Sequence, residues 1–345
     1  MSDAVLNPVG LIDGGSAATA FRADAACPLA GSRIGFTGIE VIEGPRPDRS
    51  FCDRVEAARR YPDQFARLTA PRAPFAGLTL DRPRIAGVVN VTPDSFSDGG
   101  DYADPARAID RALEQAEEGA DLIDIGGEST RPGSAPTPPE AELARVLPVI
   151  EAVASKGIPV SVDTRRALVM REAIAAGASV VNDVTALTHD PDALAAVAET
   201  EAAVILMHIR GTPETMQDAP EYSLASLEVY RWLEQRVSAC VAAGIPRERI
   251  AVDPGIGFGK TDIHNIEILN RAAMFHGLGC AVMFGVSRKS FIGRLAGIGN
   301  AKDRVPGTLA ATAIALSRGV QLHRVHDVSA ARQALAIWEA LYDGV

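Results

Sequence analysis

The stretch IPVSVDTRRALVMREAIAAGASVVND, residues 158–183, contains the repeating unit from which the fold can be predicted. Two apolar runs, Pro159–Asp163 and Ser179–Asp183, flank a segment with helical periodicity. This order of strand, helix and strand is typical of a βαβ unit with two parallel strands. Each run is apolar almost throughout and ends in a carboxylate, as expected for strands that are covered on both faces and point their last side chain into a site.

The same unit repeats on both sides of this stretch. Further strands are expected at Ile85–Val91, Asp121–Ile125, Ala203–Met207, Ile250–Asp253, Ala281–Val286 and Gln321–Val325. Helices are expected between them, notably at Leu224–Ala243, Lys289–Ala296, Pro306–Arg318 and, after the last strand, Ala330–Leu341. Eight such units over about 260 residues predict an α/β fold of the (β/α)8 TIM barrel type, which typically takes about 250 residues. A doubly wound sheet is the less favoured alternative.

Residues 1–80 lack the repeat and are interpreted as an N-terminal extension of unknown role, followed by the barrel domain at 81–345. Within the extension, Ile34–Glu43 suggests a pair of short strands and Phe51–Leu68 a helix. The proline-rich segment Ala70–Phe75 is the expected connector to the barrel.

Composition excludes several classes of protein. The chain has 345 residues, with 34 basic against 44 acidic side chains and a net charge of −10. An acidic balance without a basic stripe disfavours a nucleic-acid partner. No apolar run approaches the roughly 18 to 20 residues that span a bilayer, and the N-terminus lacks the pattern of a secretory signal. The cysteines are scattered, as in a reducing compartment, so we expect a cytoplasmic protein without a membrane partner.

Polar side chains gather where the expected strands end, which is where barrel enzymes place their sites. They are Asn90, Asp124, Asp163, Asn182, Asp183, Met207-His208, Asp253, the run Ser287-Arg288-Lys289-Ser290, Arg324 and His326. A single aspartate at a strand end is often only a helix N-cap. Capping does not explain polar groups at all eight ends.

The types of these side chains predict two subsites. Asp163, Asn182 and Asp253 offer acceptor edges to a flat heterocycle such as a 2-amino-4-oxo-pyrimidine, and Lys289 adds a donor for a ring carbonyl or nitrogen. A second group suits a phosphate or pyrophosphate, because bidentate arginines match such anions. This group consists of Asn90, Arg131, Arg324 and His326.

The order of motifs resembles the dihydropteroate synthases. Two long runs carry the resemblance, NVTPDSFSDGG at 90–100 and DLIDIGGESTRPG at 121–133. Shorter matches follow in order: SVDT at 161–164, Asn182-Asp183, Met207-His208, DPGIGFGK at 253–260, SRKS at 287–290 and RVHDV at 324–328. The resemblance covers residues 84–341. It implies condensation of p-aminobenzoate with 6-hydroxymethyl-7,8-dihydropterin pyrophosphate, release of pyrophosphate, a bound Mg²⁺, a homodimer and a target for sulfonamides.

The resemblance also implies roles for individual residues. Asp163, Asn182, Asp253 and Lys289 would hold the pterin, Asp124 would support that pocket, and Met207 and Phe258 would form its walls. Asn90 would bind Mg²⁺, and Arg131, Arg324 and His326 would bind pyrophosphate. Phe96 and Pro132 would come from loops that close over p-aminobenzoate, whose carboxylate would meet Ser290, and Thr130 would be a further substrate-binding residue. Lys260 lies within a motif but is as consistent with a loop cap as with a substrate contact.

Two departures and two alternatives remain open at this stage. Arg210 stands where many members have Gln, and Ile256 replaces a common Phe. A methyltetrahydrofolate:corrinoid methyltransferase would share the pterin carboxylates but needs no pyrophosphate site, so Arg131, Lys289 and the Arg324/His326 pair favour the synthase. A non-catalytic pterin-binding subunit would be expected to have lost loop residues such as Phe96 and Arg131, which are present here.

Overall fold

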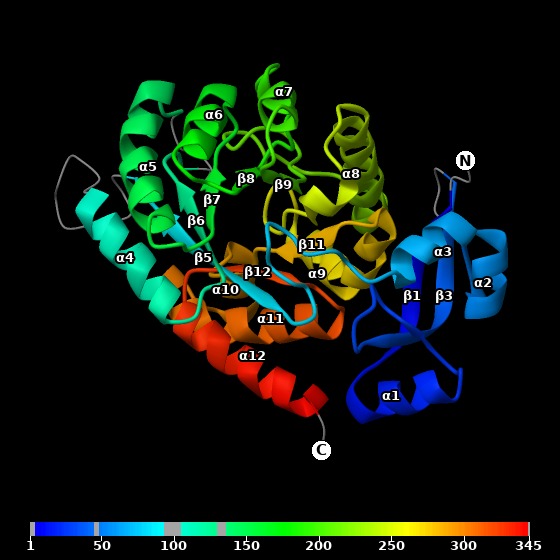
Figure 1. Ribbon diagram of the computed structural model, residues 1–345. Helices are drawn as coiled ribbons and strands as arrows, with labels where there is room; N and C mark the ends of the chain where they lie inside the picture. Colours follow the sequence, from blue (N-terminus) through cyan, green and yellow to red (C-terminus); the bar gives the residue numbers. More distant parts are fainter. Residues whose placement is uncertain (1–3, 45–47, 93–104, 130–135, 344–345) are drawn as a thin grey trace.

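The computed structural model describes residues 4–44, 48–92, 105–129 and 136–343. They form a closed barrel of parallel strands surrounded by helices, and a small four-stranded sheet that lies beside the barrel (Figure 1). The expected (β/α)8 barrel is therefore confirmed, because eight strands close in the order β10-β11-β12-β5-β6-β7-β8-β9.

Each barrel strand lies within two residues of its expected position. The strands are β5 (Arg84–Asn90), β6 (Leu122–Gly126), β7 (Val160–Asp163), β8 (Val180–Asp183), β9 (Ala203–Met207), β10 (Ile250–Asp253), β11 (Ala281–Phe284) and β12 (Leu322–Val325). All eight pair in parallel with their neighbours.

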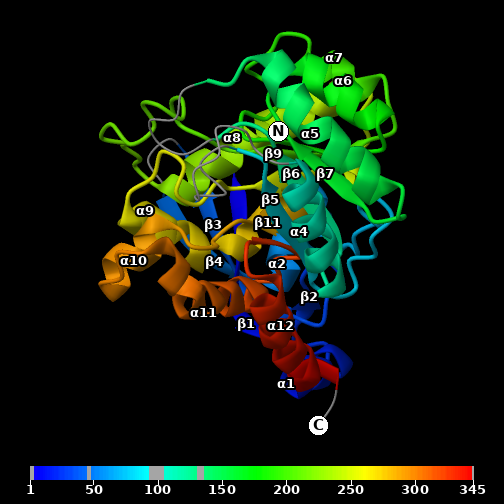
Figure 2. The same ribbon diagram turned by 90° about the vertical axis from the view of Figure 1, so that its left-hand side faces the viewer.

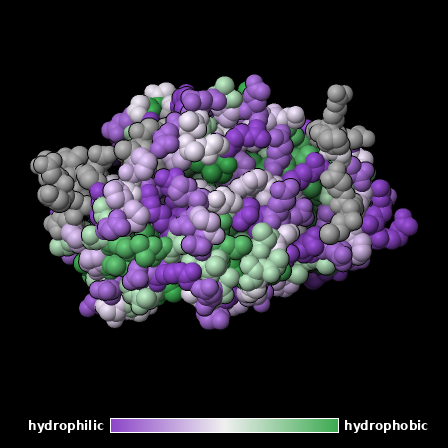
Figure 3. Space-filling model, turned by 90° about the horizontal axis from the view of Figure 1, so that it is seen from above, coloured by the Kyte–Doolittle hydropathy of each residue, from purple (hydrophilic) through white to green (hydrophobic). Residues whose placement is uncertain are grey.

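Helices cover the outside of the barrel, as Figures 1 and 2 show from two sides. They are α4 (Pro105–Glu117), α5 (Pro139–Ala154), α6 (Ala167–Ala175), α7 (Ala193–Ala198), α8 (Ala225–Ala242), α9 (Asp262–Asn270), α10 (Ser290–Ala296), α11 (Val305–Ser317) and α12 (Val328–Asp343). Short 3-10 helices also occur, of which η3 (Ala272–Leu278) precedes β11. Among the described residues, no helix is long and apolar enough to cross a membrane. The face in Figure 3 shows hydrophilic side chains interspersed with groups of hydrophobic ones.

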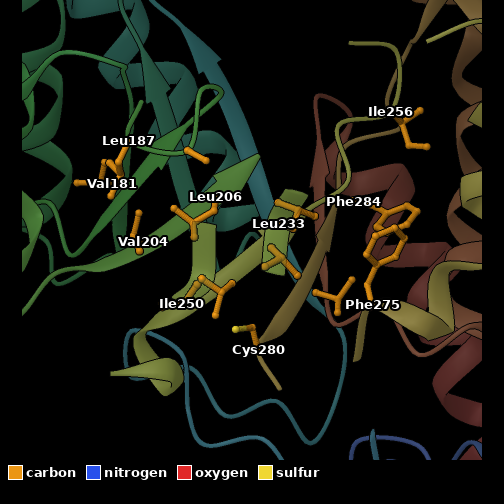
Figure 4. Close-up of a cluster of buried hydrophobic side chains, with 14 of the residues drawn as sticks. Val181, Leu187, Val204, Leu206, Leu233, Ile250, Ile256, Phe275, Cys280 and Phe284 are labelled. Carbon is orange, nitrogen blue, oxygen red and sulfur yellow. The ribbon is translucent and has the colours of Figure 1, made fainter. Parts of the chain in front are cut away.

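Alternation along the strands divides the core into two layers. In β9, Ile205 points into the barrel, whereas Val204 and Leu206 point outward to the helices. Figure 4 shows this outer layer, in which side chains from several strands meet Leu233 of α8 and Phe275 of η3. Because both faces are buried, the strands are apolar nearly throughout, which is why the sequence predicted them well.

The N-terminal sheet differs from what the sequence suggested. Strand β3 (Gly35–Glu43) is one strand, not a pair, and it lies between β1 (Val5–Ile12) on one edge and β2 (Cys27–Pro28) and β4 (Asp48–Asp53) on the other. Helix α1 (Gly14–Arg22) follows β1. The expected strand pair was therefore wrong, because its partners come from residues on both sides of Ile34–Glu43.

The single helix expected at Phe51–Leu68 was also wrong in its bounds. Phe51 belongs to β4, and two helices follow, α2 (Arg54–Arg60) and α3 (Pro62–Thr69). Asp53 caps α2 by accepting from the backbone N–H of Glu56 at 2.8 Å. Pro62, at the start of α3, cannot donate a backbone hydrogen bond, so the chain breaks before it.

The connector does more than join the two parts. At its end, the chain makes a tight turn in which the backbone N–H groups of Phe75 and Leu78 each donate to the other residue's carbonyl oxygen at 2.9 Å. The two residues between them, Ala76 and Gly77, have positive φ. Phe75 is fully buried and packs with the inward-pointing side chains of the barrel, among them Ala86 and Leu122. The connector therefore closes the end of the barrel at which the strands begin.

At the opposite end, strand register brings the polar side chains together. Asn90 pairs with Gly126, Gly126 with Asp163, and Asp163 with Asn182, so these positions form one layer across β5 to β8. Gly126 has no side chain, and a Cβ there would lie 3.4 Å from the Cβ of Asp163. Gly126 thus contributes no side chain between Asn90 and Asp163.

Candidate functional site

A pocket opens at the end of the barrel where the strands terminate. It is lined by Asp163, Asn182, Val184, Met207, Asp253, Gly255, Ile256, Phe258, Gly285, Lys289 and Arg324. Six strands or the loops after them contribute, which is the arrangement expected for a TIM barrel site. Seven of these residues were among those predicted from the sequence to form the site.

One wall of the pocket is an ion-pair network centred on Arg324. Its Nε donates to Asp124 at 2.6 Å and its Nη2 donates to Asp163 at 2.7 Å. Asn182 Nδ2 also donates to Asp124, at 3.2 Å. The buried carboxylate of Asp124 therefore holds both Arg324 and Asn182 in place. Burial raises the pKa of Asp163 to about 7, helped by the charge of Asp124 and opposed by Arg324.

Asp253 faces this network across the pocket. The backbone N–H of Gly255 donates to its Oδ1 at 2.8 Å, which fixes the carboxylate while leaving its other oxygen to the pocket. Burial raises the pKa of Asp253, whereas the Gly255 hydrogen bond and the charges of Lys289, Lys260 and Arg324 lower it. The pocket thus holds two acidic side chains, Asp163 and Asp253, whose pKa values lie above the ordinary range.

Lys289 lies between these carboxylates and an aromatic wall. Its Nζ is 3.9 Å from the centre of the Phe258 ring, a distance at which a cation is attracted to the ring face. Burial lowers the pKa of Lys289 to about 8, with Arg324 acting in the same direction and Asp253 and Asp163 opposing. Gly257 allows this approach, since a Cβ there would lie 3.2 Å from Lys289 Cδ.

His326 and Ser290 lie beside the pocket without lining it. His326 Nδ1 and Ser287 Oγ are 3.0 Å apart, and burial lowers the pKa of this histidine to about 3, so its ring is neutral. Ser290 is exposed at the start of α10. Arg288 turns away to Asp327, with its Nε 2.9 Å from that carboxylate.

The predicted residues therefore fall into three groups. Asp163, Asn182, Met207, Asp253, Phe258, Lys289 and Arg324 line one pocket, while Asn90, Asp124, Ser290 and His326 lie around it. Phe96, Thr130, Arg131 and Pro132 lie outside the described residues.

Sequence reasoning missed Val184, Gly255 and Gly285 as lining residues. Val184 lies two residues beyond Asn182, a spacing that would have signalled a shared face. Apolar and glycine side chains carry no polar group that would mark them as ligands, so Gly255 and Gly285 could not be recognised as lining residues from their residue type.

Comparison with known proteins places the chain among pterin-binding barrels. The family described as "Pterin binding enzyme" matches residues 86–326. A dihydropteroate synthase of Neisseria meningitidis serogroup B is 46% identical over 267 residues, which is 76% of this chain and 94% of that protein.

Solved structures give the same result. Dihydropteroate synthase from Xanthomonas albilineans with 4-aminobenzoic acid superposes with a TM-score of 0.73 at 49% identity, covering 77% of this chain and 96% of that one. The same enzyme in complex with 7,8-dihydropteroate has a TM-score of 0.70 at 48% identity, covering 76% and 95%. In both comparisons about a quarter of this chain has no counterpart in the relative.

Proposed function

The chain belongs to the pterin binding enzyme family, as a dihydropteroate synthase, and we propose that its barrel mouth divides the reaction between a ring subsite and an anion subsite. It is a transferase that joins p-aminobenzoate to 6-hydroxymethyl-7,8-dihydropterin pyrophosphate and releases pyrophosphate, in folate biosynthesis. The observation that carries the division is the single pocket in which acidic and amide acceptors face one lysine and one arginine.

The ring subsite consists of Asp163, Asn182, Asp253 and Lys289. The carboxylates and the Asn182 amide accept from the ring N–H groups of the pterin, and Lys289 donates to its carbonyl or ring nitrogen. Met207 and Phe258 cover the ring faces. Asp124 does not line the pocket, but its hydrogen bonds to Asn182 and Arg324 hold both in place.

The anion subsite begins at Arg324. A guanidinium has five N–H donors, and the two carboxylates occupy one each on Nε and Nη2, so donors remain for a pyrophosphate oxygen. His326 is neutral and offers a ring N–H, and Arg131 supplies a further positive charge by resemblance. These groups stabilise the negative charge that develops on the leaving group as the methylene carbon is attacked.

Mg²⁺ fits this subsite as a partner of the phosphates. Asn90 provides one neutral oxygen, and within the described part of the chain no three His, Cys, Asp or Glu side chains are grouped to hold a metal. Magnesium commonly binds through one or two protein oxygens together with substrate phosphates and water. Asn90 would hold the ion through its side-chain oxygen, and a bound Mg²⁺ would supply positive charge to the pyrophosphate.

The residues for p-aminobenzoate come from the loops around the mouth. By resemblance, Phe96 and Pro132 would cover the aromatic ring and Thr130 would contribute to substrate binding, although all three lie outside the described residues; Ser290 would meet the carboxylate of p-aminobenzoate. The aniline nitrogen then lies behind the methylene carbon, opposite the leaving group. Aligning the nitrogen, the methylene carbon and the leaving group supplies much of the rate enhancement, because the protein forms no covalent bond itself in this displacement.

The decisive experiment measures pyrophosphate release by the purified protein with dihydropterin pyrophosphate, p-aminobenzoate and Mg²⁺. Release that requires all three supports the synthase. If both substrates bind without release, the chain is a pterin-binding subunit. If the pterin binds and a methyl group passes from methyltetrahydrofolate to a corrinoid, the methyltransferase alternative holds.

We propose a homodimer and a cytoplasmic location as well. Ile314 on α11 and Ile337 and Leu341 on α12 are exposed apolar side chains on adjacent helices, which a second copy would cover. Light scattering on the eluted peak of a sizing column measures the mass directly, and a monomer would rule the dimer out. The four free cysteines agree with a reducing compartment.

A further inference from the structure

Lys260 is the one lysine of the DPGIGFGK motif, and the reaction as described gives it no role. It is 1% exposed and does not line the pocket. Its Nζ lies 2.9 Å from the carbonyl oxygen of Phe258, 3.0 Å from His208 Nδ1 and 3.4 Å from the carbonyl oxygen of His208. A lysine this deeply buried requires that its polar end be satisfied, and here three acceptors surround it.

The partner histidine is suited to accept. Burial lowers the pKa of His208 to about 2, with the charge of Lys260 acting in the same direction, so its ring is neutral. A neutral ring with its proton on Nε2 leaves Nδ1 free to accept from Lys260. Trp232 packs edge-on against this ring at a centroid distance of 4.9 Å and keeps it in place.

Two glycines bring the loop after β10 close enough for these bonds. Gly255 has φ +69, and a Cβ there would lie 2.0 Å from the carbonyl oxygen of His208. Gly259 has φ +61, and a Cβ there would lie 2.6 Å from the carbonyl oxygen of Arg210. The loop from 254 to 260 therefore lies directly on the backbone that follows β9, and Lys260 fastens it there.

The same loop carries the pocket wall. Phe258, whose carbonyl oxygen accepts from Lys260, turns its ring beneath the ammonium of Lys289. At the other end of the loop, the N–H of Gly255 donates to Asp253. Two residues of the ring subsite, Lys289 and Asp253, thus contact this loop, and Lys289 does so through the ring of Phe258.

We propose that Lys260 is a positioning residue that sets the pterin affinity by holding Phe258 against Lys289, without itself touching the substrate. The proposal rests on the proposed ring subsite. A residue that only stabilised the fold would not change the pterin Kd of the folded protein. A positioning role predicts that loss of Lys260 weakens pterin binding, and that it does so through Phe258.

A double-mutant cycle on the full-length protein tests this coupling. The variants are Lys260→Met, Phe258→Ala and the double variant, with Lys156→Met as a control at an exposed lysine. The measurements are the calorimetric Kd for dihydropterin pyrophosphate and the KM for p-aminobenzoate. We expect Kd to rise about 10-fold or more in each single variant, no further rise in the double variant, and a smaller change in KM; each such Kd change corresponds to about 1.4 kcal/mol.

Several outcomes overturn the proposal. If the Kd increases of the two single variants multiply in the double variant, Lys260 does not act through Phe258. If the Kd of a folded Lys260→Met variant is unchanged, Lys260 has no effect on pterin binding. Lys260→Gln keeps an N–H donor and is expected to give an intermediate Kd. If neither variant folds, Lys260 is assigned to stability instead. A wild-type protein that binds the pterin but releases no pyrophosphate refutes the synthase activity and leaves this cycle intact.

Discussion

Arg324 shows how one side chain is shared between the two subsites. Its bonds to Asp124 and Asp163 hold it in the wall of the pocket, and three of its five N–H donors remain for the anion that we propose. The charge of Asp163 therefore affects ring binding and the arginine at once. Since burial raises the pKa of Asp163 to about 7, this charge changes near neutral pH.

We expect pterin affinity to depend on pH through Asp163. As pH falls from 8 to 6, protonation removes an acceptor from the ring subsite, so the Kd for dihydropterin pyrophosphate should rise several-fold with a midpoint near 7. Calorimetry across this range measures it. Asp163→Asn serves as the reference, because the pyrophosphate titrates equally with both proteins; an identical pH profile for the two would contradict the assignment.

Lys289 and Arg131 should separate the two subsites. Lys289→Ala removes a charged hydrogen bond to the ring, worth about 1.5 to 3 kcal/mol, and should raise the pterin Kd roughly 10- to 100-fold. Arg131→Ala should chiefly lower kcat, because its charge is needed as the leaving group departs. Binding and single-turnover measurements distinguish these effects. Equal losses of pterin affinity in both variants would argue against separate subsites.

At the residue scale, sequence alone located the site through side chains that end apolar strands. It could not show how those side chains pair. Lys260 is buried because two loops meet, and Arg324 reaches two carboxylates because strands far apart in the chain share one barrel. Only four lysines among 34 basic residues marked Lys260 as unusual, and its partners became visible only in three dimensions.

At the scale of elements, a buried ion cluster fixes the base of the segment after β6. Glu128 accepts from Arg165 at 2.9 Å, from Arg166 at 2.8 Å and from the N–H of Thr137 at 3.0 Å. Burial alone would raise the pKa of Glu128, but these hydrogen bonds lower it overall. The two ends of the connection, at 128 and 137, are thereby tied together and to the loop after β7.

Glu128→Gln should destabilise the fold by about 3 kcal/mol, because it removes the carboxylate that pairs with the buried Arg165 and leaves Arg166 with Glu142 as its remaining carboxylate partner. Urea denaturation at pH 7 measures this loss. The pKa of Glu128 is lowered in the folded state, so its stabilisation is present above its ordinary pKa and should disappear as pH falls below about 4.

The matched control for Glu128 is Glu199→Gln, which removes the partner of Arg171 in an exposed ion pair. Its cost should not exceed about 1 kcal/mol. Equal losses in the two variants would mean that burial of the Glu128 cluster adds nothing to stability.

The elements themselves were predicted unequally. Barrel strands are continuous apolar runs, so sequence located them within two residues. Strand β1 was missed because its sequence contains Pro8 and Gly10, which usually interrupt strands. It tolerates Pro8 because, among the residues that the structure describes, β1 pairs with β3 alone and is an edge strand.

At the scale of the whole molecule, the N-terminal extension and the connector are attached to the barrel by hydrogen bonds to residues 271–280, which include η3. Arg67 donates to the carbonyl oxygen of Gly277 at 2.9 Å, and Arg72 donates to those of His276 and Cys280 at 2.7 and 3.0 Å. Glu40 in β3 accepts from Arg271 at 3.2 Å. These contacts lie just before β11, at the end of the barrel away from the pocket, so we assign them to stability.

Phe75→Ala tests this separation between stability and catalysis. The ring fills the closed end of the barrel and is fully buried, so its removal should cost about 3 to 5 kcal/mol of unfolding free energy, through lost burial and the cavity left behind. Because the pocket lies at the other end of the strands, kcat and both KM values should stay within about two-fold at temperatures where the variant is folded. Phe51→Ala is the control, since Phe51 is 72% exposed and its removal should change stability by no more than about 0.5 kcal/mol. A Phe75 variant with unchanged stability and reduced turnover would instead show that the closed end of the barrel communicates with the pocket.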